Sequence, residues 1–62
     1  MKIRITKRGR VTRCRLGAYE EEFQSGPLEI EWWIAEVGDE LETVGSNGFY
    51  IRIDDAEVAR AD

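Results

Sequence analysis

The chain has 62 residues, of which 35% are charged and 42% hydrophobic, and its formal net charge is −4. A chain this short forms one domain at most, and it buries only about 60% of the surface that its unfolded form exposes. One cysteine and no histidine exclude an internal disulfide and leave a structural zinc site unexpected. A lone cysteine fits a reducing, cytoplasmic setting, so a single cytoplasmic domain over residues 1–62 is expected. No apolar run approaches the roughly 20 residues that span a bilayer.

Charge is divided unevenly along the chain. Residues 1–16 contain seven of the nine basic side chains and no acid, whereas all thirteen acids lie from Glu20 onward. A basic segment can bind phosphate, and an acidic segment can repel or imitate it. The composition therefore raises two functional classes, a nucleic-acid-binding domain and a protein-binding module.

A basic hairpin is expected at the start of the chain. Residues 2–6 and 11–16 alternate apolar and polar side chains, which is the pattern of strands with one apolar face. Residues 7–10 include a glycine and have the length of a hairpin loop, so the two strands are expected to pair. This register predicts two opposite faces: Ile3, Ile5, Cys14 and Leu16 on one, and Lys2, Arg4, Val11, Arg13 and Arg15 on the other.

Residues 28–37 form the strongest expected strand. Alternation directs Leu28, Ile30, Trp32 and Ile34 toward the core and leaves Trp33 on the opposite face. Two alternatives are left open: Trp33 is exposed there, or the strand bends and Trp33 packs under residues 17–27 or the C-terminal segment.

A second hairpin is expected over residues 40–53. Asn47-Gly48 is a strong signal for a two-residue hairpin loop, and this loop would pair Val44 with Ile51. Phe49, Ile51 and Ile53 then supply a further apolar face.

The two remaining segments are expected to be helical turns or loops. Asp54 can cap a short C-terminal helical turn, with Glu57 in the capping-box position. Residues 17–27 fit either one helical turn or an ordered loop, since Tyr19 and Phe23 lie four positions apart.

These elements predict a mainly all-β protein. The expected fold is a small five-stranded SH3-like or OB-like barrel, built from two hairpins and a long central strand, with a short C-terminal helical turn. The expected core consists of Ile3, Ile5, Leu16, Leu28, Ile30, Trp32, Ile34, Leu41, Phe49, Ile51 and Ile53.

The stretch from Glu31 to Glu36 resembles the Trp-Trp strand of eukaryotic SH3 domains. Tyr19 and the acidic run beside it resemble the acidic specificity loop of that family. The usual alanine–leucine–tyrosine opening is absent, and no proline precedes the last strand. The resemblance therefore concerns architecture, and it implies no ligand residues for this chain.

Catalysis is not expected, so the chain is interpreted as a non-enzyme. Histidine, the usual general base near neutral pH, is absent. Cys14 lies between two arginines, which can activate a thiol, but alternation places it on the opposite face, where a thiol behaves as a small hydrophobe. The carboxylates lack the ligand spacing of a calcium loop, and no metal or cofactor is expected.

Two surfaces are candidates for binding. The first is a protein-interaction surface of Trp33, Tyr50 and Arg52, because Trp, Tyr and Arg dominate binding hot spots. The second is a phosphate-binding surface on the basic hairpin: Lys7, Arg8, Arg10, Arg13 and Arg15. Cross-strand pairing of the basic side chains with Glu29 and Glu31 is the alternative interpretation of this second surface.

The preferred interpretation is a non-enzymatic protein-interaction module that binds a larger protein or forms a homodimer. It includes a regulator or inhibitor that imitates the charge of nucleic acid. Nucleic-acid binding through the basic hairpin is the second choice, and no membrane partner is expected.

Overall fold

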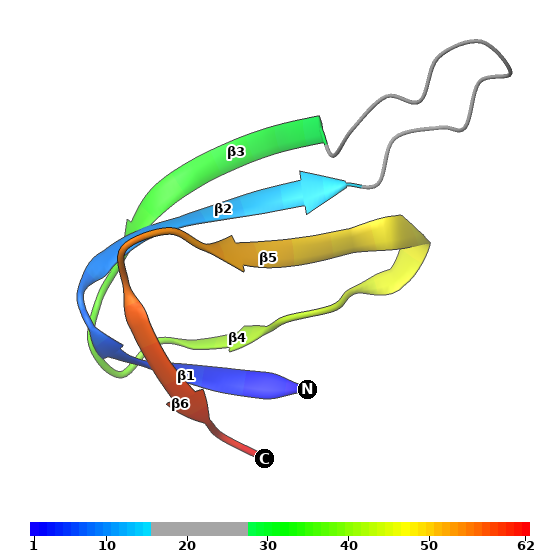
Figure 1. Ribbon diagram of the computed structural model, residues 1–62. Coiled ribbons are helices and arrows are strands. Elements are labelled where there is room, and N and C mark those ends of the chain that lie inside the picture. The colour runs from blue at the N-terminus through cyan, green and yellow to red at the C-terminus, as the bar shows by residue number, and fades with distance from the viewer. Residues whose placement is uncertain (16–27) are drawn as a thin grey trace, which may run out of the picture.

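The computed structural model describes residues 1–15 and 28–62, and these residues form two three-stranded antiparallel sheets (Figure 1). The strands are β1 (Lys2–Lys7), β2 (Gly9–Arg15), β3 (Leu28–Ala35), β4 (Glu40–Glu42), β5 (Phe49–Ile53) and β6 (Glu57–Arg60). Sheet A has the order β4-β1-β6, and sheet B has the order β3-β2-β5. The expected all-β class is confirmed, with six strands instead of five. The expectations for residues 17–27 and for Leu16 as a core residue lie outside the described residues.

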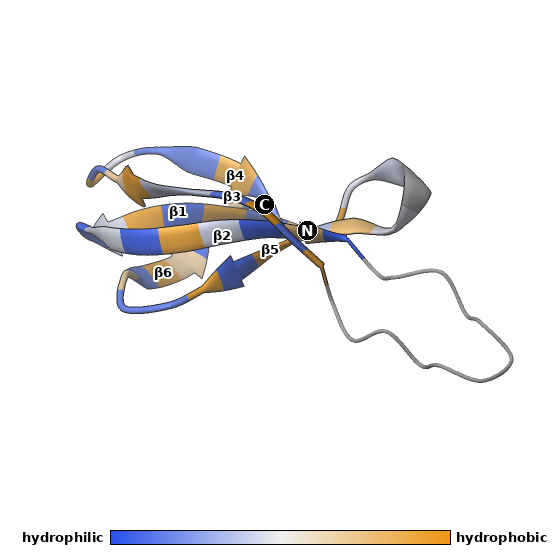
Figure 2. Cartoon of the chain, turned by 90° about the horizontal axis from the view of Figure 1, so that it is seen from above, coloured by the Kyte–Doolittle hydropathy of each residue, from blue (hydrophilic) through white to orange (hydrophobic). Residues whose placement is uncertain are grey.

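The expected N-terminal hairpin is wrong, because β1 and β2 belong to different sheets. β1 pairs with β4 and β6, whereas β2 pairs with β3 and β5, so each is the central strand of its own sheet. The chain passes from one sheet into the other around Arg8 (Figure 1). Hydrophobic and hydrophilic residues alternate along both strands (Figure 2). Ile5 and Val11, on the inner side of this bend, are both fully buried, whereas the hairpin register placed Val11 among the charges.

The position of Gly9 in this bend has no room for a side chain. A Cβ atom on Gly9 would lie 2.5 Å from Ala56 Cα and 2.7 Å from the carbonyl carbon of Asp55, because the segment before β6 crosses directly over Gly9. Ala35 is the cross-strand partner of Gly9, and it is completely buried. Gly9, Ala35 and Ala56 thus form a narrow crossing at the centre of the core.

The predicted inward face of β3 is wrong: the two faces are reversed from Glu31 to Ala35, and the register with β2 shifts at a bulge between Glu31 and Glu29. Val11 pairs with Trp33, and Gly9 with Ala35, so Trp33 and Ala35 point toward the core. Ile34 would not fit in the narrow crossing that Ala35 occupies. The four residues expected in the core are instead exposed: Leu28 by 51%, Ile30 by 46%, Trp32 by 63% and Ile34 by 40%.

The hairpin between β4 and β5 is present, but its register differs from the prediction. Val44 bridges to Tyr50, not to Ile51, and the loop contains a three-residue 3₁₀ turn over Ser46–Gly48. Gly48 has a φ of 80°, a left-handed conformation that favours glycine. The bridge links the two sheets, and Ile51 packs against the core as expected.

The C-terminal segment is a strand, so the predicted helical turn is wrong. β6 pairs with β1, with Val58 opposite Ile5 and Arg60 opposite Ile3. Val58 packs against the core. A segment this short cannot hold a helix unaided, and the open edge of β1 supplies backbone partners instead. No helix in the described residues is long and apolar enough to cross a membrane.

Candidate interaction face of sheet B

The outer side of sheet B gathers aromatic and basic side chains from all three strands. Directly opposite residues in an antiparallel pair point to the same side of the sheet. Thr12 lies opposite both Trp32 and Arg52, and Cys14 lies opposite Tyr50. Tyr50 and Arg52 therefore share a face, as predicted, but their tryptophan neighbour on that face is Trp32. We call this side of sheet B the outer face; its exposed or half-buried side chains are Arg10, Ile30, Trp32, Ile34, Tyr50 and Arg52, and Thr12 and Cys14 are buried on the same side.

Trp33 lies on the other side of β3. It is half-buried and packs against the core cluster of Ile5, Val11, Ala35 and Ala56. The sequence left open whether Trp33 is exposed or packed, and the structure supports packing of this side chain against the core.

Apolar side chains dominate the β3 edge of the outer face. Trp32 and Ile34 occupy alternate positions of the strand, Ile30 lies at the bulge between Glu29 and Glu31, and all three are exposed. The guanidinium carbon of Arg10 lies 5.9 Å from the centroid of the Trp32 ring, which is cation–π range. Within the described residues β3 pairs with β2 alone, so it is an edge strand of sheet B (Figure 1).

A network of ion pairs fixes Arg52 in the middle of the outer face. Its Nη2 lies 2.7 Å from Glu29 Oε1, and its Nε lies 2.9 Å from Asp54 Oδ1. The Thr12 hydroxyl donates a 2.7 Å hydrogen bond to the other oxygen of Asp54. The Thr12 hydroxyl, followed by Arg52, lowers the pKa of Asp54, and Glu29, followed by Asp54, raises the pKa of Arg52. Both groups therefore stay charged at neutral pH.

Cys14 and Tyr50 form the far end of the outer face. Cys14 is completely buried, so the predicted burial of this thiol is confirmed, although its neighbours are not Ile3 and Ile5. Burial, followed by the neighbouring Cys14, raises the pKa of the Tyr50 hydroxyl. Tyr50 is thus a neutral, half-buried aromatic at neutral pH.

The five candidate phosphate-binding residues do not form one surface, because the hairpin that would gather them does not exist. Four have a carboxylate partner within the described chain: Lys7 with Glu57 at 3.5 Å, Arg8 with Glu36 at 2.6 Å, Arg10 with Asp54 at 3.4 Å and Arg13 with Glu31 at 3.1 Å. The guanidinium of Arg15 lies 5.4 Å from the Phe49 ring centroid. The alternative of cross-strand ion pairing holds for Arg13 and Glu31, whereas Glu29 pairs with Arg52.

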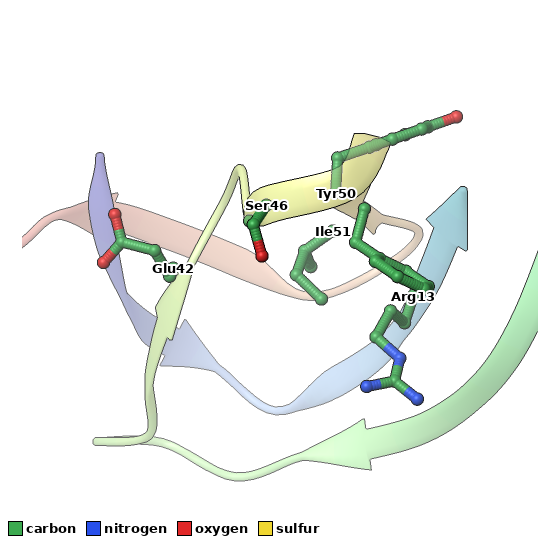
Figure 3. Close-up of a pocket in the computed structure, with 7 residues that line it drawn as sticks. Arg13, Glu42, Ser46, Tyr50 and Ile51 are labelled. Atoms are coloured by element: carbon green, nitrogen blue, oxygen red, sulfur yellow. The ribbon is translucent and has the colours of Figure 1, made fainter. Parts of the chain in front are cut away.

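A shallow pocket of about 240 Å³ lies beside the β4–β5 hairpin, and its lining includes Arg13, Glu42, Ser46, Phe49 and Ile51 (Figure 3). Its two charged groups already have partners. Glu42 accepts a 2.9 Å bond from the N-terminal ammonium group, and Arg13 pairs with Glu31. The Tyr50 ring points away from Ser46 and Ile51 (Figure 3). Among the described residues no group of three metal-ligating side chains occurs.

No family model, no curated protein and no solved structure matches the chain. The evidence for function therefore comes from the geometry of the described residues.

The alternation pattern predicted Ile30, Trp32 and Ile34 to lie in the core, whereas all three are surface residues. The signal was present in the adjacent tryptophans, because neighbours in a strand point to opposite sides and one of the two must face outward. Alternation alone could not decide which tryptophan that was.

Proposed function

We propose that the chain is a non-enzymatic protein-interaction module that binds a protein partner through the outer face of sheet B. The observation that carries this proposal is the exposure of Ile30, Trp32 and Ile34, at 46%, 63% and 40%, on one edge strand. Contiguous exposed apolar groups rimmed by polar residues mark interaction sites in soluble proteins. Burial of these side chains would supply the hydrophobic driving force for association.

Trp32 is the anchor of the proposed contact, in place of Trp33. It is the most exposed aromatic of this face, whereas Trp33 is half-buried against the core. Tyr50 and Arg52 remain proposed contact residues, because they lie on the same side as Trp32. Arg52 is pre-organised by Glu29 and Asp54, so it loses little side-chain freedom on binding.

The test is affinity capture from nuclease-treated lysate, followed by direct binding to the purified captured protein. Val37 is also an exposed large apolar residue, but it lies outside the outer face, which makes it the control position. We expect Trp32→Ala to weaken binding by about 30-fold or more, as a hot spot does, and Val37→Ala to leave it unchanged. Binding that is equal in the two variants would refute the proposal.

Nucleic-acid binding is the second candidate, and the ion pairs make it less favourable. Phosphate contacts by Arg8 or Arg13 would require exchange of a carboxylate partner at 2.6 or 3.1 Å. The ion pairs also leave fewer carboxylates free on the surface. This weakens the case for an inhibitor that imitates the charge of nucleic acid. A salt-sensitive mobility shift that is lost in an Arg13→Glu, Arg15→Glu double variant would restore this candidate.

We propose that the scaffold is a small SH3-like or OB-like barrel. Two features support this arrangement: the bend around Arg8, which carries the chain between the sheets, and the Val44–Tyr50 bridge, which joins them. An experimental structure with continuous pairing around the sheets would establish closure, and an unpaired gap between β4 and β5 would contradict it.

A further inference from the structure

We infer that the partner on this face is a second copy of the chain, joined by antiparallel β3–β3 pairing centred on Trp32. This inference rests on the proposed function and names its partner. It follows from three properties of β3: its free edge in the described structure, its neutralised charges and its self-complementary order of side chains.

The edge of β3 is long enough to bind another strand. It contains eight residues, and in the described part of the chain only β2 pairs with it. An edge strand presents a row of unpaired N–H and C=O groups, which is a template for pairing with another chain. Proteins usually protect such an edge with a short strand, a proline, a bulge or a free charge. β3 has eight residues and no proline, and its register with β2 shifts only near its start, between Glu29 and Glu31, so the edge is regular from Glu31 to Ala35.

The charges of β3 are neutralised within each copy. Its only ionisable side chains are Glu29 and Glu31. Glu29 lies 2.7 Å from Arg52, and Glu31 lies 3.1 Å from Arg13. Two β3 edges can therefore approach each other without the repulsion that unpaired glutamates would cause.

The order of side chains selects one register. When the two-fold axis passes beside Trp32, Trp32 lies opposite its own copy and Ile30 lies opposite Ile34. An axis beside Glu31 would place two glutamates directly opposite each other, which is unfavourable. An axis beside Trp33 would place Ile30 opposite Glu36, beyond the end of the strand.

The preferred register satisfies the symmetry of a two-fold dimer. Ile30 of one copy meets Ile34 of the other, and the reverse contact occurs on the far side of the axis, as an isologous interface requires. The two outer faces then lie on the same side of one continuous six-stranded sheet. Six large apolar side chains contact one another along the junction.

Sedimentation equilibrium of the full chain tests the dimer, with Ile34→Lys and Val37→Lys as a matched pair. Both substitutions place a lysine at an exposed β-branched position, but only Ile34 lies at the proposed junction. We expect a concentration-dependent dimer for the wild type and for Val37→Lys. Ile34→Lys should raise the dimer dissociation constant by about 30-fold or more. A monomeric wild type, or a dimer insensitive to Ile34→Lys, would overturn the inference.

Disulfide cross-linking tests the register, in a Cys14→Ser background. Opposite residues in an antiparallel pair have Cα atoms about 4.5–5.5 Å apart, which suits a disulfide. An oxidised mixture of the Ile30→Cys and Ile34→Cys variants should form a mixed dimer. Neither variant alone should cross-link, because residues 30 and 34 each lie opposite the other position. Efficient cross-linking in either variant alone, or none in the mixture, would contradict the register.

These experiments also separate the dimer from the proposed function. If the wild type is monomeric but a captured protein binds it in a Trp32-dependent way, the second-copy inference is wrong and the interaction module stands. If dimerisation and capture are both unaffected by changes at Trp32 and Ile34, both proposals fail.

Discussion

The two sheets have similar strand patterns, but the outer surface of sheet A is charged and that of sheet B carries exposed apolar side chains. On sheet A, Arg4 lies opposite Glu40 with a 2.9 Å ion pair, and Lys2 lies opposite Glu42, so cross-strand charges cover the surface. On sheet B, Trp32 and its apolar neighbours are exposed. Both β1 and β3 alternate apolar and charged residues, yet the isoleucines point inward in β1 and outward in β3. An alternating strand thus has two distinct faces, and its neighbours decide which face is buried.

The narrow crossing at Gly9 accounts for this difference. β3 has apolar groups on both sides, so hydrophobicity alone does not orient it. Ala35, the partner of Gly9, is completely buried, so a larger side chain such as that of Ile34 would overpack this position. Steric limits at this point therefore orient β3 from Glu31 to Ala35, up to the bulge at Ile30.

The largest expected effect comes from adding a side chain at Gly9, inside this narrow crossing. In a Gly9→Ala variant the new methyl group would overlap the backbone of Asp55 and Ala56, which cannot yield as a flexible side chain can. We expect the free energy of unfolding to fall by more than about 4 kcal/mol, measured by urea denaturation.

Gly45→Ala is the control for this substitution. A Cβ atom there would lie 3.7 Å from Phe49, an ordinary van der Waals contact. The cost should be about 1 kcal/mol or less. If the two variants were equally stable, the crossing would not be the constraint that orients β3.

A second prediction compares one isoleucine from each sheet. Ile5 of β1 is fully buried, whereas Ile34 of β3 is 40% exposed. We expect Ile5→Ala to cost about 2–5 kcal/mol and Ile34→Ala less than about 1 kcal/mol in chemical denaturation at monomer concentrations. A larger loss for Ile34→Ala would mean that β3 packs with the opposite face inward.

A third prediction concerns the acid stability of the outer face of sheet B. The Thr12 hydroxyl is the main cause of the lowered pKa of Asp54, so Thr12→Val should raise that pKa toward its ordinary value of 3.8. In the wild type this group stabilises the fold fully above about pH 3.8, and the contribution is lost as pH falls through the lower folded-state pKa. In the Thr12→Val variant, less stability should be lost as the pH falls through this range. Carboxyl NMR titration measures the pKa directly.

Thr43→Val is the matched control for the titration. The Thr43 hydroxyl donates to the backbone oxygen of Met1 and to no carboxylate. This variant should leave the pKa of Asp54 unchanged. The same shift in both variants would refute the role of Thr12.

The smallest expected effect lies on sheet A. Arg4, followed by Lys2, lowers the pKa of Glu40, but all three side chains are exposed. Exposed ion pairs contribute little and are screened by salt. Glu40→Gln should therefore cause a slight loss of stability at low ionic strength that disappears in high salt. A large, salt-independent loss would show that sheet A depends on this pair.

Much of the secondary structure could be predicted from the sequence, because strand alternation is a local property. β1, β3 and β5 lie where the pattern placed them, and the shared face of Tyr50 and Arg52 follows from their spacing on one strand. The bend around Arg8 could not be distinguished from a hairpin. A short segment with a glycine suits both, and only the distant strands β4 and β6 decide between them.

Long-range contacts also explain the remaining errors. Asp54 had the position of a helix cap, but its carboxylate binds Thr12 and Arg52 instead. The choice between Trp32 and Trp33 depended on the fit of Ala35 against Gly9, which involves a third segment at Ala56. No local pattern contains this information.

The pairing of β1 with β6 constrains when the molecule can fold during synthesis. Ile3 lies opposite Arg60, so the first strand has to wait for the last one before sheet A is complete. Contacts between residues so distant in sequence form slowly, because the intervening chain must first be ordered. On the ribosome, β1 would therefore leave the exit tunnel with an unpaired edge, and the finished sheet forms only after residue 60 has emerged.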